Sequence, residues 1–407
     1  PFMLLTTALA GVLLSAPAQT QDRPQDRPPA RPAQTPAQRP VGENEAVDLG
    51  TIDVTAARPR GSADTDIPPD VTLDAEQIQS YGASSIAELL TYLEPLTRSS
   101  SGRGGGQPVF LVNGRRISGF REIAGLPTEA IERTEILPEE VALRYGYSAD
   151  QRVVNFVLKQ DFRSVNTELT AGGPTAGGRS NVEVEGGLVT IDRADRWNVD
   201  VELQRQTALN ETERDIVRTP PDTSVGRTLL PDTRRAQLRG AYKRDLDQNT
   251  QGTVSFSLED SNSQSFLGLS GLAQTGPARA RTADSLNAQL GVLLDGYWGD
   301  EWRWNSNFNY ARVESDTSTD RDLGGAPDTA NSISQSLGAE LVLNGDVYEL
   351  PAGDVSTTFR FGADQVSLDS TSVRSGLVTE REQSRETVSG SGNFNIPIAR
   401  RDREVLA

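Results

Sequence analysis

The sequence predicts an α+β domain followed by antiparallel strands of a transmembrane β-barrel, in an up-and-down meander of about ten strands. Three observations support this fold class. Residues 65–160 mix helical and strand patterns. From Val165 onward, apolar and polar residues alternate in segments near the length of about ten residues that a tilted membrane strand has. The links between these segments are alternately short and long, as successive hairpins of a meander require.

The composition excludes several classes of protein. The chain has 407 residues, enough for more than one domain, but only 35% are hydrophobic, which is poor for a large dry core. A formal charge of −17 argues against a nucleic-acid partner. Cys and His are both absent, so disulfides, thiolate or imidazole metal sites and His-dependent triads are excluded. We therefore expect no metal, no cofactor and no enzyme activity.

The N-terminus resembles an export signal. Leu4 to Leu14 form a short apolar run, and Ala16-Pro17-Ala18 offers a cleavage site before Gln19. The run is shorter than the roughly 20 residues of a membrane-spanning helix. Residues 1–18 are thus predicted to be a signal peptide whose charged start is missing, and the start of a buried helix is the alternative.

Residues 19–50 are rich in Pro, Gln, Arg and Ala, a composition that cannot bury enough apolar surface to offset the entropy of ordering. This segment is predicted to be a disordered periplasmic arm. Residues 47–56 then alternate between apolar and polar types, so they can add as a strand to the edge of another sheet. The first strand of the next domain is the alternative interpretation.

The α+β domain is predicted over residues 65–160. A helix capped by Asp74 is expected over Thr72–Ile78, and a second over Ser84–Leu93, with Ser84 and Glu88 near its capping positions. The further expected elements are a strand ending in the Asn113-Gly114 turn, a short helix over 127–131, and strands over 133–137 and 153–158.

Four segments of this domain resemble, in order and spacing, the plug domain of TonB-dependent outer-membrane receptors. They are the strand Val109–Ile117, the segment Ile131–Leu137, the pair Tyr145-Gly146 and the closing strand Val153–Lys159. The family's usual Arg-Gly-Pro is replaced by Pro138-Glu139-Glu140, and Ser148 to Arg152 stands where Gly-rich sequence is usual.

The resemblance implies import of a scarce ligand of siderophore, cobalamin or carbohydrate type across the Gram-negative outer membrane. The inner-membrane protein TonB, with ExbB and ExbD, would drive import by pulling on an N-terminal box. Residues 51–57 are the candidate box, and its contact residues would be Thr51, Ile52, Asp53, Val54 and Thr55. The expected partners are thus TonB, a small-molecule or chelate ligand and outer-membrane lipid. A non-transporting structural or adhesion barrel of the outer membrane is the alternative.

Four arginines are the predicted ligand-binding residues: Arg98, Arg103, Arg115 and Arg116. Arg103 lies in the Gly-rich segment Ser99–Gly106, which lacks the Gly-Lys-Ser/Thr ending of a phosphate loop and is expected to be a mobile loop. The resemblance implies that this loop faces the extracellular ligand. Glu132, Arg133 and Glu135, by contrast, are predicted to form an ion-pair network that stabilises the domain.

The alternation that predicts the barrel is clearest in Trp197–Gln204, where odd positions are apolar and even positions polar. The other predicted strands are 165–171, 181–188, 236–242, 254–258, 286–294, 302–311, 337–343, 357–363 and 388–398. Such alternation also fits a soluble sandwich with one wet face. The links favour the barrel, since 190–196, 243–250 and 295–301 are short, whereas 207–233, 260–284, 313–332 and 365–387 are long.

Aromatic residues fall near the ends of the predicted strands, as in the interfacial belts of membrane proteins. They are Trp197, Tyr242, Trp302, Trp304 and Tyr310. Ordinary cross-strand packing is the alternative explanation.

The size of the predicted barrel gives a further expectation. A barrel of about ten strands is barely wider than its own side chains, and a plugged lumen belongs to barrels of roughly 22 strands. Residues 165–407 are therefore predicted to be the first part of a barrel, in a sheet that does not close on itself.

Overall fold

The computed structural model describes residues 58–98, 107–193, 195–217, 222, 224–271, 274–299, 302–351 and 353–398. All of the described residues belong to one compact unit, which begins at residue 57. The predicted signal peptide, periplasmic arm and box, together with Arg103, lie outside the described residues.

The α+β domain, residues 58–160, is built on a five-stranded sheet in the order β1-β4-β5-β2-β3. Its strands are β1 (Val71–Asp74), β2 (Val109–Val112), β3 (Arg115–Arg116), β4 (Ile131–Leu137) and β5 (Val153–Leu158). Its helices are α1 (Ala75–Ser80), α2 (Ile86–Thr97) and α3 (Glu140–Arg144), with the short 3-10 turns η1 (Phe120–Glu122) and η2 (Thr128–Ala130). β2 and β5 are parallel and the other pairs antiparallel. All six residues of β5 are buried, so this central strand is the axis of the domain.

Local sequence explains where the helices begin. Asp74 caps α1 in a capping box with Gln77, as expected, but Thr72 and Leu73 pair with β4 instead of joining the helix. The N-cap of α2 is Ser85, one residue after the predicted start. Ser84 instead donates its N–H and hydroxyl to the Glu88 carboxylate, and these bonds lower the pKa of Glu88. Strand pairing by residues 72–73 is a tertiary effect that the local pattern could not reveal.

The core of the domain is shared with the second part of the chain. Ile78, Ile86 and Phe156 are fully buried at its centre. The same cluster includes Val189 and Ile191, which belong to the strand β7 (Asn181–Asp192) of the large sheet. The domain is therefore packed onto that sheet by an apolar contact.

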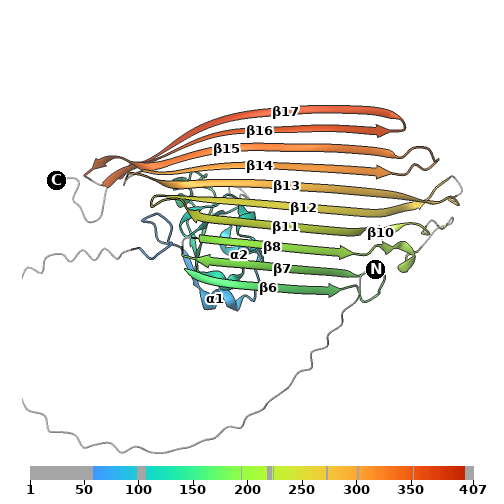
Figure 1. Ribbon diagram of the computed structural model, residues 1–407, viewed down its shortest axis with the longest axis horizontal. Coiled ribbons are helices and arrows are strands. Elements are labelled where there is room, and N and C mark those ends of the chain that lie inside the picture. The colour runs from blue at the N-terminus through green and yellow to red at the C-terminus, as the bar shows by residue number, and fades with distance from the viewer. Residues whose placement is uncertain are drawn as a thin grey trace, which may run out of the picture. The chain divides into compact units, whose positions relative to one another are not determined.

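The large sheet, called the wall below, has ten strands, each antiparallel to its neighbour and in chain order. Its strands are β6 (Asp161–Gly172), β7, β8 (Asp195–Gln206), β11 (Asp232–Asp245), β12 (Thr250–Leu269), β13 (Ala278–Trp298), β14 (Trp302–Thr319), β15 (Asp328–Leu350), β16 (Gly353–Arg374) and β17 (Leu377–Asn395). Figure 1 shows them side by side, from β6 at one edge to β17 at the other. Among the described residues β6 and β17 do not pair with each other, so the sheet is open. The predicted meander of about ten strands is confirmed.

Most of the predicted long links are wrong, because the strands continue through them. β12 reaches Leu269 and β13 begins at Ala278, and β16 and β17 are joined by residues 375–376 alone. The strand extensions are rich in Ser, Thr and Asp and lack the apolar alternation. That alternation depends on what each face of a strand contacts, and it does not show whether the strand's backbone is paired. The link after β8 remains long, and it contains the short pair β9 (Leu209–Asn210) and β10 (Thr228–Leu230) with the 3-10 turn η3 (Glu211–Glu213).

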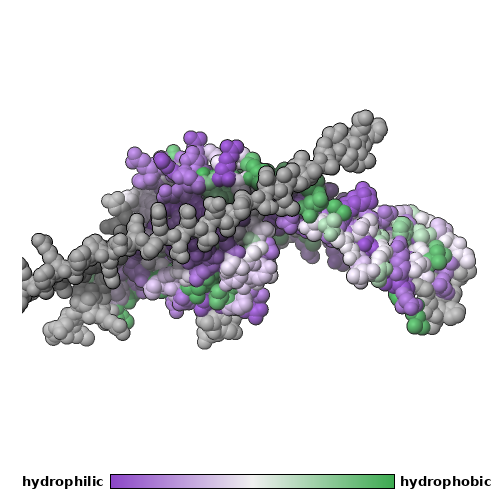
Figure 2. Space-filling view, turned by 90° about the horizontal axis from the view of Figure 1, so that it is seen from below, coloured by the Kyte–Doolittle hydropathy of each residue, from purple (hydrophilic) through white to green (hydrophobic). Residues whose placement is uncertain are grey.

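The two faces of the wall differ in chemistry. The inner face, which meets the α+β domain, carries polar residues such as Glu202, Gln237 and Ser257. The outer face carries apolar residues at the alternate positions. Those that are exposed include Val165, Leu169, Val201, Leu203, Leu238, Val254, Phe256, Leu258, Leu286, Leu290, Phe308, Leu337, Leu341 and Phe361. In Figure 2 hydrophobic residues reach the surface between hydrophilic ones.

The predicted aromatic residues fall into two groups. Trp197 is the register partner of Tyr242, and Trp302 that of Trp298, all near the short links. These pairs satisfy both predicted explanations, a belt and cross-strand packing. Tyr310 instead lies in the middle of β14, because the strand continues to Thr319. No helix among the described residues is long and apolar enough to cross a membrane.

Candidate functional site at the contact between the α+β domain and the wall

Three ion pairs join the α+β domain to the inner face of the wall. Glu122 pairs with Arg196 of β8, and both side chains are 3% exposed. Arg115 lies 2.6 Å from the buried Asp295 of β13, and Arg116 lies 2.5 Å from Glu340 of β15. Removing one partner of the Glu122–Arg196 pair would leave an uncompensated buried charge. The docked position is therefore specified by opposite charges as well as by apolar packing.

The hairpin of β2 and β3 delivers two of these charges. Its turn is Asn113-Gly114, with φ of 50° and 73°, and a Cβ on Gly114 would lie 2.3 Å from the Ser62 carbonyl oxygen. The turn therefore requires glycine, and the predicted Asn-Gly turn is confirmed. Arg115 and Arg116 are consecutive, so their side chains point to opposite faces and reach different strands.

Aromatic rings hold both guanidinium groups in place. Arg115 lies 5.7 Å from the centre of the Tyr297 ring, and Arg116 lies 4.5 Å from that of Tyr147. Arg116 also donates hydrogen bonds of 3.0 and 3.2 Å to the Tyr147 hydroxyl. These contacts orient the arginines toward their carboxylate partners.

Glu340 serves a second arginine, this one from the wall. Arg360 of β16 donates a 2.7 Å hydrogen bond to the Glu340 carboxylate and a 3.2 Å bond to the carbonyl of Gly146. Gly146 has φ +77°, and a Cβ there would lie 3.0 Å from Val342 of β15. The Tyr145-Gly146 motif thus has a physical role, since it lets the wall approach the domain backbone closely.

Tyr145 fixes the adjoining loop. Its hydroxyl accepts the N–H of Asp64 at 2.9 Å and donates to the Gly114 carbonyl at 2.9 Å. Arg303 of β14 donates to the same carbonyl at 3.2 Å. Burial raises the pKa of Tyr145, so the hydroxyl stays protonated. Domain and wall therefore share one carbonyl acceptor.

The loop around η1 makes a second group of contacts. The Ser118 and Ser255 hydroxyls lie 2.7 Å apart across the contact, and Arg121 bonds to Gln289 of β13. Glu122 also accepts the N–H and hydroxyl of Ser118 at 2.8 and 2.9 Å. Each oxygen of this buried carboxylate therefore has a partner.

The predicted ion-pair network around Arg133 is confirmed. Arg133 lies 2.9 Å from Glu135 and 3.4 Å from Glu132. Glu135 is buried and also accepts hydrogen bonds from Ser62 and Asn155. This network lies within the domain and stabilises it.

Two cavities open on the wall. One, of about 360 Å³, lies beside the domain and is lined by Arg116, Tyr147, Glu340, Arg360 and Asp364 among others. It falls within the size range of small-molecule sites, and its walls carry charges of both signs. The other, of about 300 Å³, is lined by Asp284, Asp316 and Asn331 with several Thr residues. No group of three or more acids that suits a metal ion occurs among the described residues.

The structure places the predicted ligand-binding residues in different parts of the domain. Arg98 is exposed at the end of α2 and pairs with Glu94 at 2.7 Å. Arg115 and Arg116 lie together at the contact, each on a carboxylate of the wall. Arg103 and residues 51–55 lie outside the described residues. Ligand contact by these arginines stays a prediction.

Sequence reasoning missed the wall's own contributions to the contact. They are Arg196, Asp295, Arg303, Glu340 and Arg360. All occupy polar positions of alternating strands, and Arg196, Asp295 and Arg303 are also charged residues close to a short link. That signal could mark the strand end but could not name the partner.

Comparison with known proteins gives structural likeness alone. No protein-family model and no curated protein matches the chain. A variant of the ferric enterobactin receptor PfeA of Pseudomonas aeruginosa is similar at 14% identity and a TM-score of 0.44, over 81% of this chain and 60% of that one. The ferric yersiniabactin uptake receptor FyuA of Yersinia pestis is similar at 11% and 0.44, over 80% and 61%. FpvA of Pseudomonas aeruginosa is similar at 11% and 0.46, over 83% and 50%.

The chain thus spans about 60% of the length of the first two of these solved structures. With TM-scores below 0.5, the architecture rests on this chain's own strand pairing and burial.

Proposed function

We propose that this chain belongs to a TonB-dependent outer-membrane receptor that imports a scarce ligand. One observation carries the proposal: an α+β domain is held by buried ion pairs on the polar face of a sheet whose other face is apolar and exposed. A barrel wall in lipid needs apolar residues outside and tolerates polar residues inside. A domain docked on the polar side is then a plug.

The wall fits a lipid environment in its backbone as well as its side chains. Strands in hydrocarbon must satisfy every backbone hydrogen bond, which only a closed sheet does. The inner strands of this wall are paired on both sides, whereas β6 and β17 have one free edge each among the described residues. The proposal therefore treats residues 165–407 as the first part of a barrel and requires strand partners for β6 and β17 in the membrane.

We propose that TonB drives import by binding residues 51–55. An extended segment can add to a partner's sheet edge by backbone hydrogen bonds, which is why Thr51, Ile52, Asp53, Val54 and Thr55 are assigned to contact TonB, supported by ExbB and ExbD. Deleting residues 47–56 in the native gene should abolish energised uptake and leave ligand binding intact. Undiminished uptake by this deletion strain would refute the assignment.

The ligand class is proposed as siderophore, cobalamin or carbohydrate, with Arg98, Arg103, Arg115 and Arg116 as candidate contacts. The similar solved structures are ferric-siderophore receptors by name, so iron is the first class to test. The native host and a strain lacking the gene would be compared for uptake of radiolabelled ferric siderophores, cobalamin and maltodextrins. We expect one class to be lost on deletion and restored by the gene.

A non-transporting structural or adhesion barrel is the competing function, and domain movement separates the two. Transport requires the α+β domain to shift, whereas a structural barrel works with it fixed. The chain has no cysteine, so Ser118→Cys with Ser255→Cys would create a single disulfide at hydroxyls now 2.7 Å apart. Uptake should stop when this pair is oxidised and return on reduction, and each single-cysteine variant serves as control. Absence of uptake from the reduced protein and from the single-cysteine controls as well would favour the non-transporting barrel, and uptake that persists in the oxidised protein would contradict a transport route that needs the domain to move.

A further inference from the structure

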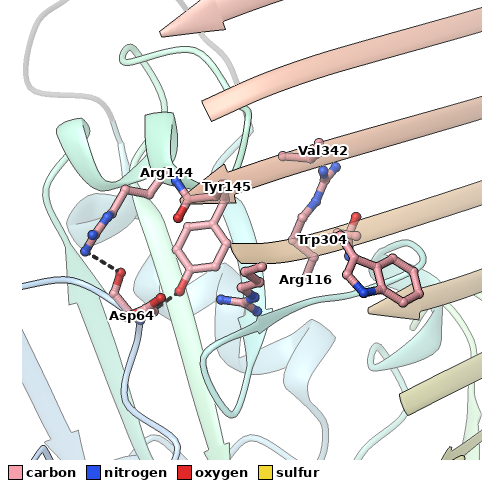
Figure 3. Close-up of a pocket in the computed structure, with 9 residues that line it drawn as sticks. Asp64, Arg116, Arg144, Tyr145, Trp304 and Val342 are labelled. Carbon is pink, nitrogen blue, oxygen red and sulfur yellow. Dashed lines mark hydrogen bonds between the residues drawn. The ribbon is translucent and has the colours of Figure 1, made fainter. Parts of the chain in front are cut away.

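A small cavity lies where the α+β domain meets β14 and β15. Its volume is about 20 Å³, enough for one water-sized particle and too small for a phosphate or an organic acid. Figure 3 shows Asp64, Arg116 and Tyr145 of the domain drawn around it with residues of the wall.

The charge around this cavity is strongly positive. Arg116, Arg144 and Arg303 line it, against the single carboxylate of Asp64. The Asp64 carboxylate is already bound by Arg58 at 2.7 Å. Arg144 and Arg303 donate to backbone carbonyls, and neither forms an ion pair among the described residues. These two guanidinium groups therefore have no carboxylate in direct contact at the cavity, and they interact with Asp295, Asp64 and Asp346 only at longer range.

Two buried nitrogen atoms of the lining have no acceptor. Nη1 of Arg116 and Nδ2 of Asn305 are both buried and make no hydrogen bond, and Oδ1 of the same Asn305 amide is also unpaired. The two residues are only 7% and 5% exposed. Leaving a buried donor unpaired is unfavourable, and more so for a charged one. Both residues line the cavity, so an anionic acceptor placed there would offer these donors a partner.

We propose that this cavity binds one monatomic anion, chloride under physiological conditions, which bridges the α+β domain and the wall. Three guanidinium groups exclude a cation. Tyr145 does not compete for the anion, because its hydroxyl already donates to Gly114 and accepts from Asp64. The amide of Asn305 offers its NH2 group from the wall, and Arg116 and Arg144 offer theirs from the domain. The anion strengthens docking, whether or not the protein transports a ligand.

Two measurements on the purified full-length protein in detergent test this site. Crystals grown in sodium bromide should show an anomalous-scattering peak in the cavity. The urea concentration at which a protease cleaves the α+β domain should rise with sodium chloride and then saturate, as ligand binding to the folded state requires. Sodium gluconate at equal ionic strength, whose anion is too large, should not reproduce the rise.

Variants assign the effect to this cavity. Asn305→Leu should remove the chloride dependence. Asn307→Leu is the matched control, because it lies two residues along the same strand on the same face and does not line the cavity, so the dependence should remain. If Asn305→Leu does not fold, Arg144→Met should shift the half-saturating chloride concentration upward by about tenfold, corresponding to the loss of one charge contact. An ordered water without a bromide peak, or equal midpoints in chloride and gluconate, would overturn the proposal.

Discussion

On its β7–β12 side the α+β domain meets the wall through apolar packing and one ion pair that is buried on both partners. On its β13–β16 side it meets the wall through ion pairs in which at least one partner is partly exposed. Val189 and Ile191 belong to the domain core on the first side, and Glu122 and Arg196 are both 3% exposed. On the second side Arg115 is 31% and Arg360 is 41% exposed.

The difference indicates which side of the contact binds the domain more strongly and which side separates from the wall more easily. Apolar packing and a dry ion pair lose much free energy when separated, because no solvent replaces the lost contacts. Partly hydrated charges lose less, since water takes over their hydrogen bonds. We therefore expect the β7–β12 side to anchor the domain and the β13–β16 side to release first. Substitutions on the two sides should therefore differ in their effect on the free energy of docking, which protease cleavage in urea measures.

The largest effect is expected from Arg196→Met on the anchoring side. It leaves the Glu122 carboxylate buried without a countercharge and should destabilise docking by about 3–5 kcal/mol. Adding Glu122→Gln should restore part of this loss, because the buried charge is then removed. A double variant as unstable as the single one would show that the pair matters only through packing.

Ile191→Ala should come next, at about 2–3 kcal/mol, toward the low end of the range for large-to-small core substitutions. The side chain is 6% exposed and contacts the domain core across the contact. Val184→Ala on the same strand is the control, since Val184 lies on the outer face and is exposed. Equal shifts by both variants would contradict the shared core.

These anchors also mark how far the sequence could predict the molecule. Alternation in β6–β17 and the four plug-like segments predicted the fold class, because both patterns are local. Arg115 and Arg116 could be singled out as candidate binding residues. Their partners Asp295 and Glu340, however, lie 180 and 224 residues further along the chain. Pairing over such separations depends on the register of the sheet, which no single segment encodes. The strand extensions beyond the apolar alternation were missed for the same reason.

Glu340→Gln tests the β13–β16 side, which is expected to separate first. The carboxylate binds Arg116 at 2.5 Å and Arg360 at 2.5 Å, but Arg360 is partly exposed, which discounts its contribution. We expect a loss of about 1–2 kcal/mol. Asp364→Asn, two inner-face positions along β16 from Arg360, is the control, because no ion pair of Asp364 occurs among the described residues. A loss as large as that of Arg196→Met would remove the distinction between the two sides.

Gly146→Ala should cost about 1 kcal/mol in backbone strain, because φ is +77°, and should also push against Val342. Gly82→Ala is the matched control, with φ +68° and nothing within 4 Å of the added Cβ. Both variants should unfold at lower urea, but only Gly146→Ala should weaken docking, and Val342→Ala should relieve it. Equal effects on docking would mean that β15 does not approach this turn.

The smallest effect on docking is expected from substitution of Glu88. This residue lies on α2, away from both sides of the contact, so its variant serves as the reference for the others. The Ser84 N–H and hydroxyl lower the pKa of Glu88, so the ionised carboxylate stabilises the folded domain. This contribution is present above the ordinary carboxylate pKa and is lost as pH falls through the lowered pKa of the folded state. The stability difference between wild type and Glu88→Gln should therefore be small at neutral pH and vanish in acid. Docking should be unchanged throughout, because Glu88 does not touch the wall, and a pH-dependent change in docking would place α2 within the contact.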